Sequence, residues 1–271
     1  MIRINFKKLS SLGSVFIVFV IPFALKAQNI NYETISADVD RYRGSVSIGA
    51  GGYLSSLTGA GLSAHLVGNY DLRPVPLVAR LRADVEFLSA GTNDIYDGRI
   101  TEIEGGVLFP LIPGKKKTKP IKFVTDNYTS GGYEYTKYFY PEGGQVKTDL
   151  NARGGLYYLG VAGARNIGFT AGVGLRNRKH IQVKLNDGTY TIHKETQFYL
   201  EGIVTPVTKL ATEFNVDPEP DPNRSTTKIG ARVGWIRFER GGAESIEISA
   251  RPFDDTYIIT IGGAYTFGKR F

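Results

Sequence analysis

The chain has 271 residues, of which 42% are hydrophobic, and a formal net charge of +7. Its mean hydropathy of −0.15 argues against a polytopic helical membrane protein, and the lack of cysteine excludes disulfides, a thiol nucleophile and a cysteine-type zinc site. Four basic residues lie within residues 1–27, which contain no acids, so removing them leaves only +3. With no basic helix or aromatic–basic module beside it, that charge does not indicate nucleic-acid binding.

Residues 1–27 have the composition of a secretory signal peptide. Arg3, Lys7 and Lys8 form a basic start, an apolar run covers residues 15–25, and Ala27 is the small residue before a cleavage site at Gln28. The alternative is an N-terminal membrane anchor, but the run is shorter than the ~20 residues that span a bilayer as a helix. We therefore expect export and a mature chain that begins at Gln28.

After a polar segment, residues 28–43, apolar and polar residues alternate in ten successive runs. Strict alternation predicts a β-strand with two different faces. In the stretch from Val78 to Leu88, the set that includes Arg80 and Glu86 alternates with the set that includes Leu81 and Phe87. No run shows the 3.6-residue period of a helix. The predicted strands are 45–54, 60–71, 78–88, 99–112, 119–140, 145–160, 167–178, 190–207, 227–238 and 256–271.

These runs favour a membrane β-barrel over a soluble β-sandwich. They span about 10–14 residues, whereas soluble strands cluster near ~5–6 and tilted outer-membrane strands need ~9–11. Their polar faces mix charges with many glycines, which suits a narrow interior, and their apolar faces would contact lipid. We therefore expect residues 44–271 to form an all-β, antiparallel, up-and-down transmembrane β-barrel of about ten strands, with eight or twelve as the alternatives.

The last predicted strand ends in an aromatic pattern. Counting back by twos from Phe271, its apolar face includes Phe267, Tyr265 and Tyr257. This pattern resembles the C-terminal β-signal that the barrel-assembly machinery reads in bacterial outer-membrane proteins. Together with the FALKAQ cleavage context, 23–28, and the run Arg153–Tyr158, it makes the chain similar to the small outer-membrane β-barrel proteins of the Bacteroidota.

The resemblance implies a location and partners but no functional residues. It implies the cell outer membrane of a Gram-negative envelope, contact with outer-membrane lipid and with the assembly machinery, and in some cases a place in a larger envelope or secretion complex. Barrels of this kind have an even strand number and both termini in the periplasm. Residues 28–43 would then be periplasmic, together with the turns at 72–76, 113–118, 161–166 and 209–225.

Charged residues on the inward faces are the candidate site. Six basic and five acidic residues are close to neutral in sum, as mutual pairing requires. In the expected topology four of the carboxylates lie in the outer half of the barrel, with Arg176 and Arg178 at a similar height. The predicted interior network consists of Arg80, Arg82, Asp84, Glu86, Glu102, Glu104, Arg153, Arg176, Arg178, Glu201 and Arg232.

The main interpretation is a structural salt-bridge network that plugs the barrel. One alternative is a narrow, porin-like channel for small or charged solutes, and another is a cation site, because clustered carboxylates do not all stay ionised without cations. We expect a non-enzymatic protein that is either structural or a subunit of an envelope complex, with no cofactor and no metal.

Two further features of the sequence bear on other functions. Ser63 and His65 share a face at i, i+2, which leaves an outer-membrane lipid hydrolase as a remote alternative, although no G-x-S-x-G motif is present. His65 is expected to be one more polar interior residue. His180 and His193 flank a turn at Asn186–Gly188 and are expected to face solvent rather than to bind a metal ion.

Overall fold

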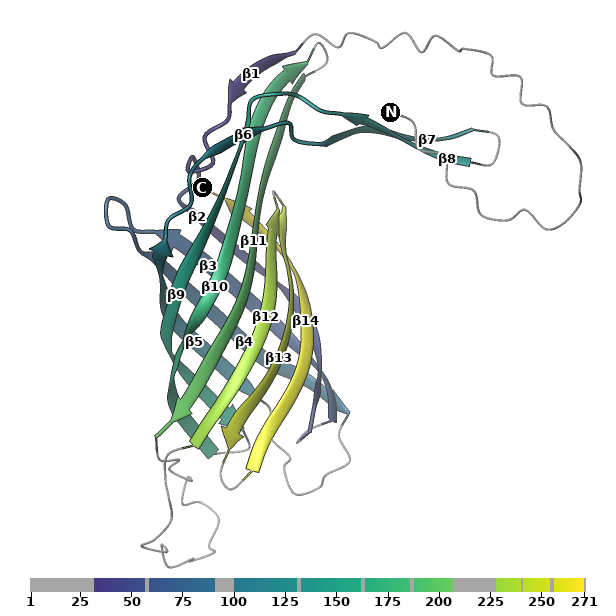
Figure 1. Ribbon diagram of the computed structural model, residues 1–271. Coiled ribbons are helices and arrows are strands. Elements are labelled where there is room, and N and C mark those ends of the chain that lie inside the picture. The colour runs from purple at the N-terminus through teal and green to yellow at the C-terminus, as the bar shows by residue number, and fades with distance from the viewer. Residues whose placement is uncertain are drawn as a thin grey trace, which may run out of the picture.

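The computed structural model describes residues 32–56, 59–90, 100–130, 133–161, 164–185, 188–206, 228–239, 241–253 and 256–270. The regular elements in these ranges are all strands (Figure 1). No helix among the described residues has the length and apolar character needed to cross a membrane.

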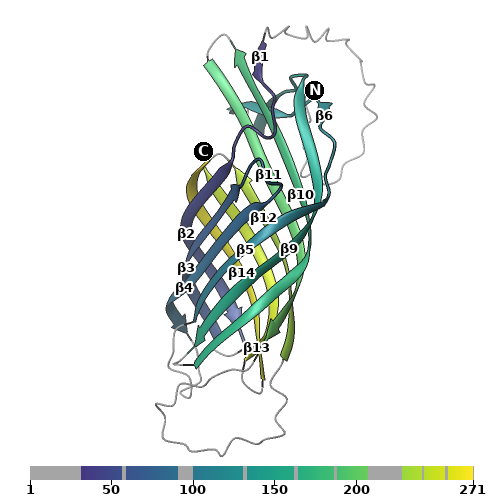
Figure 2. The same cartoon turned by 90° about the vertical axis from the view of Figure 1, so that its left-hand side faces the viewer.

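Ten antiparallel strands pair with their neighbours around a closed barrel (Figures 1 and 2). The ring closes where the last strand pairs with the first, from Ser45 opposite Arg270 to Ser55 opposite Thr260. This arrangement confirms the predicted up-and-down barrel of ten strands. In order around the ring they are β2 (Gly44–Ser55), β3 (Gly59–Asp71), β4 (Val78–Ala90), β5 (Thr101–Ile112), β9 (Gly144–Val161), β10 (Ala164–Leu185), β11 (Gly188–Thr205), β12 (Lys228–Glu239), β13 (Gly242–Phe253) and β14 (Thr256–Arg270).

One of the ten predicted strands is not in the ring, and one strand of the ring was not predicted. Most of the segment 119–140 forms a separate hairpin of β7 (Phe123–Ser130) and β8 (Tyr133–Phe139). The missing strand is β13, which lies between β12 and β14. The two errors cancel in the count.

The exchange of strands also changes which turns lie at which end. We call the end where β2 begins and β14 ends the terminal end, and the opposite end the far end. The turns at 72–76 and 113–118 lie at the terminal end, as predicted. The β9–β10 turn, predicted for the same end at 161–166, joins strands at the far end instead. β11 also ends and β12 begins at the far end, and the predicted turn at 209–225 lies outside the described residues.

The terminal end continues into a second structure above the ring. β10 and β11 are 22 and 18 residues long, and their paired ends extend beyond the shorter strands (Figures 1 and 2). β1 (Glu33–Ser36) pairs with the extension of β10, and β6 (Lys117–Lys119) pairs with β9. A small apolar cluster, which includes Ile121, Phe123, Ile181 and Val183, anchors the base of the β7–β8 hairpin to this extension.

Side chains in the ring have the orientation that the alternation predicts. On β4, Leu81 and Val85 are exposed on the outer surface, while Arg80 and Glu86 are buried inside. A bulge in β4 places Ser63 opposite Glu86 and Leu62 opposite Leu88, which leaves Phe87 as the extra residue. Leu88, predicted to point inward, is therefore exposed on the outside together with Phe87.

Inside the barrel, the seam between β14 and β2 is lined mostly by small residues. A Cβ atom on Gly49 would lie 2.1 Å from the carbonyl oxygen of Tyr265, and one on Gly268 would lie 2.1 Å from that of Val46. Only glycine allows so close an approach of the two backbones. Across the seam, Thr266 donates a hydrogen bond of 2.9 Å to Ser47 inside the barrel.

Candidate functional site: the charged interior of the barrel

A buried carboxylate at mid-depth is the centre of the interior network. Glu201 on β11 accepts hydrogen bonds from Arg80 at 2.9 Å, from Arg153 at 2.5 Å and from Arg232. Glu104 on β5 bridges the same set, since it pairs with Arg80 and lies 2.5 Å from Arg232. These side chains come from strands on different sides of the ring, so their contacts cross the barrel.

The network continues toward β13 through two further arginines. Arg82 binds Asp84 at 2.6 Å and also pairs with Glu247, while Arg251 lies 2.7 Å from Glu102 and 2.8 Å from Glu247. We call these ten residues the central network. They are the arginines 80, 82, 153, 232 and 251 and the acids Asp84, Glu102, Glu104, Glu201 and Glu247.

Aromatic and imidazole groups support the central network. The hydroxyl of Tyr199 donates to Glu247 at 2.7 Å, and the guanidinium of Arg153 lies 4.1 Å from the centroid of the Tyr199 ring. Nδ1 of His65 contacts a carboxylate oxygen of Asp84. His65 is only 3% exposed, so it is a buried member of the interior surface.

A separate charged layer lies nearer the terminal end. Arg176 makes a two-pronged contact with Glu195, at 2.8 and 3.0 Å, and a further contact with Asp71 at 3.2 Å. Arg178 binds Asp149 at 2.7 Å. Arg176 and Arg178 therefore do not lie at the height of Asp84 and Glu102, which corrects the predicted grouping. The cause is the reversed direction of β10 that follows from the misassigned strand.

The segment before β2 lies across the terminal end of the barrel. Val39 is 1% exposed, Asp40 binds Arg178 at 2.6 Å, and the ring of Tyr42 packs against His193 with centroids 4.7 Å apart. Lys116, from the chain between β5 and β6, lies 3.1 Å from Asp40. We call residues 38–42 the mouth segment, because they lie across the terminal end of the barrel and contact charged residues of its interior.

The charged residues of the mouth segment and their neighbours stabilise one another's ionised forms. Burial favours the neutral form of Asp40, but the positive charges of Arg178, Lys116 and Lys147 outweigh it, so the pKa of Asp40 lies below its ordinary value. Asp38 accepts a hydrogen bond from Lys116 at 2.7 Å. That bond lowers the pKa of Asp38 and raises the pKa of Lys116.

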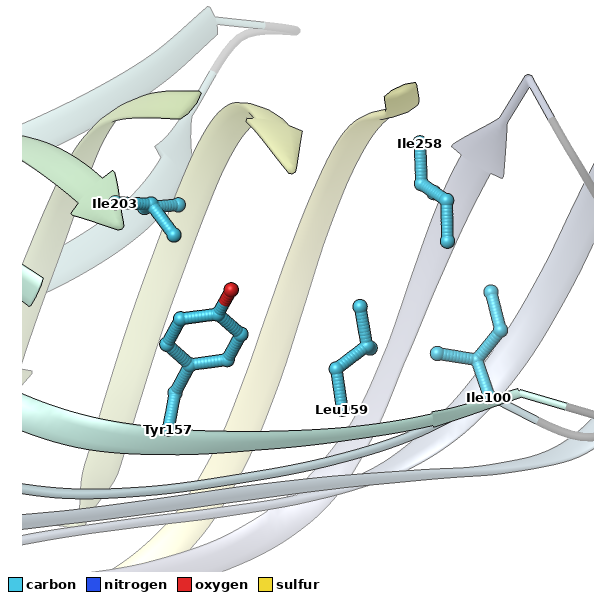
Figure 3. Close-up of a cluster of buried hydrophobic side chains, with 5 residues drawn as sticks. All are labelled: Ile100, Tyr157, Leu159, Ile203 and Ile258. Carbon is cyan, nitrogen blue, oxygen red and sulfur yellow. The ribbon is translucent and has the colours of Figure 1, made fainter. Parts of the chain in front are cut away.

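An apolar layer fills the interior at the far end. Tyr157 and Leu159 of β9 point inward together with Ile100, Ile203 and Ile258 from other parts of the ring (Figure 3). The hydroxyl of Tyr157 is bonded to Thr205. A second buried cluster, which includes Val67, Tyr199 and Phe238, packs inside the ring beside the central network.

Between the far-end apolar layer and the central network lies a cavity of about 70 Å³. Its lining combines small residues from the seam, such as Gly51 and Ala264, with the carboxylates of Asp84, Glu86, Glu102 and Glu247 from strands on either side of the seam. In the described part of the chain, no three His, Cys, Asp or Glu side chains are grouped to hold a metal ion.

The structure brings most of the eleven predicted residues together. Eight of them, Arg80, Arg82, Asp84, Glu102, Glu104, Arg153, Glu201 and Arg232, belong to the central network. Arg176 and Arg178 form the terminal layer, and Glu86 stands apart, on the cavity wall. Sequence reasoning missed Glu247 and Arg251 because β13 was not assigned, although Ile246, Glu247, Ile248 and Ser249 alternate as the other strands do.

The histidines at 180 and 193 do not have the predicted environment. They lie opposite each other on β10 and β11, are 0% and 5% exposed, and their Nδ1 atoms are 3.2 Å apart. The expectation that they face solvent is wrong, because the extension of β10 and β11 is covered by the mouth segment.

The aromatic residues of the predicted assembly signal lie on the outer surface. Tyr257, Tyr265 and Phe267 are exposed on β14, and the rings of Tyr265 and Phe267 pack edge to face with centroids 5.1 Å apart. Phe271 lies outside the described residues. No protein-family model matches the sequence, and no curated protein sequence is similar enough to count as a match.

Proposed function

We propose that the protein is a non-enzymatic outer-membrane β-barrel that serves as a structural protein or as a subunit of a larger envelope complex. The observation that carries this proposal is the inversion of its surfaces. Large apolar residues are exposed around the outside of the ring, among them Ile48, Leu156, Phe169, Leu200 and Ile229, while the interior is charged. A soluble monomer rarely exposes so much contiguous apolar surface, whereas a barrel in lipid requires it.

The proposed orientation places the terminal end in the periplasm. Both ends of the barrel chain lie there, as they do in bacterial single-chain barrels. The mouth segment, the extension of β10 and β11, and the β7–β8 hairpin would then face the periplasm, and the far-end apolar layer would face outward. We include in the proposal a signal peptide at 1–27, recognition of the β14 aromatic residues by the assembly machinery and, on the resemblance alone, a Bacteroidota origin.

The β7–β8 hairpin favours the complex over the purely structural role. It forms its own two-stranded sheet and projects away from the ring (Figure 1). An isolated two-stranded hairpin is marginally stable in water, and its free edges are open to pairing with another chain. A periplasmic partner that adds a strand to this hairpin would stabilise it and would cover one of its free edges.

The proposal includes a closed interior. The central network, the terminal layer and the far-end apolar layer occupy successive depths of the barrel, and the mouth segment covers one end. In planar lipid bilayers, the wild type should therefore show no steady conductance. A variant with Glu102→Gln and Glu104→Gln should unfold at a lower temperature, because Arg232 and Arg251 lose carboxylate partners, and it should conduct better than the wild type.

The opposite result would favour the channel. Steady, ion-selective conductance of the wild type that is lost in the Glu102/Glu104 double variant would show that these carboxylates line a working pore. For the location, fractionation of the host cell should recover the protein in the outer membrane with Gln28 as its first residue. Recovery from the soluble periplasm would refute the membrane barrel.

A further inference from the structure

Glu86 has an environment unlike that of any other carboxylate described inside the ring. The side chain is 1% exposed, and its Oε2 atom accepts a hydrogen bond of 2.7 Å from the backbone N–H of Ile100. Its Oε1 atom is buried without a hydrogen-bond partner. Among the described residues, no basic side chain forms a salt bridge with it. A buried carboxylate in this state is strongly disfavoured unless something compensates its charge.

The charge balance of the interior also isolates Glu86. The central network contains five arginines and five acids, so it is neutral without Glu86. On the cavity wall, Arg82 and Arg251 are committed to Asp84, Glu102 and Glu247. With His65, which also lines the cavity, uncharged, one negative charge therefore remains beside the cavity with no partner from the protein.

The cavity has the size and chemistry to hold that partner. Its volume of about 70 Å³ exceeds the ~10–15 Å³ that one ordered water needs by this measure, so it can hold a small ion together with several waters. Glu102 lines the same cavity, and its Oε1 atom is also buried without a hydrogen bond. Ser63, which lies opposite Glu86 on the neighbouring strand, and Thr260 also line the cavity, and their side chains provide hydroxyl oxygens.

We propose that this cavity binds one small, singly charged cation between Glu86 and Glu102, with Ser63 and Thr260 contributing neutral oxygens. A single charge matches the single unpaired carboxylate. A divalent metal ion fits less well, because no group of three acidic or histidine ligands is present in the described part of the chain. The ligand is an alkali-metal ion or a small ammonium ion, and this site goes beyond the structural role proposed above.

The test uses the full mature barrel in detergent at pH 8, where a histidine of ordinary pKa is neutral. The protein is dialysed to equilibrium against rubidium chloride, with N-methylglucamine chloride as the reference for a large cation, and bound rubidium is counted per barrel. We expect one rubidium ion per wild-type barrel and background levels in Glu86→Gln, which keeps an oxygen for the Ile100 N–H. Glu244→Gln, which removes an exposed carboxylate from β13, should retain the ion.

Thermal unfolding supplies a second measurement. Replacing N-methylglucamine by potassium or rubidium should raise the wild-type midpoint saturably and leave that of Glu86→Gln unchanged, and Ser63→Ala should need several-fold more cation for the same shift. A stronger response to ammonium or methylammonium than to potassium would assign the site to an amine. If Glu86→Gln does not fold, the Ser63→Ala response decides.

Two results would overturn the proposal. One is a wild-type barrel that retains no more rubidium than Glu86→Gln and melts at the same temperature in every cation. The other is a carboxylic-acid band in the infrared spectrum of the wild type that is absent from Glu86→Gln, because Glu86 would then be neutralised by a proton.

Discussion

Removing the charge of Glu201 should be among the most costly single changes in the barrel interior. Its side chain is 0% exposed and contacts three arginines. In Glu201→Gln, Arg80 and Arg232 keep Glu104, but Arg153 loses its carboxylate partner and is left with neutral acceptors, such as the amide oxygen of Gln197 at 3.1 Å. One buried guanidinium thus loses its counter-charge, which typically costs ~3–5 kcal/mol.

The matched double variant separates charge from packing. In Arg153→Met with Glu201→Gln both charges are absent, and the methionine still covers part of the Tyr199 ring, so the double variant should be more stable than Glu201→Gln alone. As an exposed control, Glu239→Gln removes a carboxylate that lies 2.9 Å from Lys194, where both side chains are about 40% exposed. That change should cost less than ~1 kcal/mol.

Urea titrations in lipid vesicles measure these costs, with the fluorescence of Trp235, the single tryptophan, as the signal. The expected order of stability is wild type, then Glu239→Gln, then the double variant, then Glu201→Gln. A cost for Glu201→Gln no larger than that of Glu239→Gln would refute the buried network, since it would mean that water already screens Glu201. Strictly additive costs of Arg153→Met and Glu201→Gln would refute their direct pairing.

Leu81 is exposed on the outer face of β4, so Leu81→Arg should destabilise the barrel by ~2–4 kcal/mol if it lies near the bilayer midplane. Ala264→Lys, which points a charge into the acidic cavity, should cost far less in the same urea titration; an equal or larger cost would contradict the assignment of the two faces. The pKa of Asp40 is lowered in the folded state, so its contribution to holding the mouth segment is fully present above the unfolded value of ~3.9 and is lost as the pH falls below it. A fluorescent label on Ala37, beside the segment, should therefore report its release only below about pH 4, and release between pH 6 and 8 would contradict this assignment.

The alternation of the sequence was sufficient to predict the ring, because each strand has one outward and one inward face. Nine of the ten predicted runs coincide with strands of the ring to within a few residues, apart from the longer β10. The remaining run, 119–140, could not be recognised as a hairpin from its alternation pattern alone. Residues 119–140 are rich in aromatic and β-branched residues, as a strand is, and only the Gly131–Gly132 pair near their middle indicates a hairpin.

The inward residues could be predicted, but their partners could not. The stagger between strands and the direction of each strand decide which charges meet across a barrel. Neither property can be predicted from the sequence of one strand alone. Arg176 illustrates this. Because one strand was misassigned, the prediction placed Arg176 at the height of Asp84 and Glu102, whereas it lies in the layer nearer the terminal end. The burial of His180 and His193 was equally hidden, since it depends on the mouth segment that covers β10 and β11.

The glycine-lined seam has a consequence for the order of folding. Every other pair of neighbouring strands in the ring is close in sequence or is separated by the β6–β8 insertion, whereas Ser47 and Thr266 meet from 219 residues apart. The loop that this pairing closes is the longest in the protein, and its entropic cost is recovered only after the other strands have formed. On its inner face, where glycines stand in place of large side chains, the seam offers few contacts to guide an early encounter. The ring should therefore form as a curved open sheet that grows from its hairpins, and the joining of β2 to β14 should be its last step.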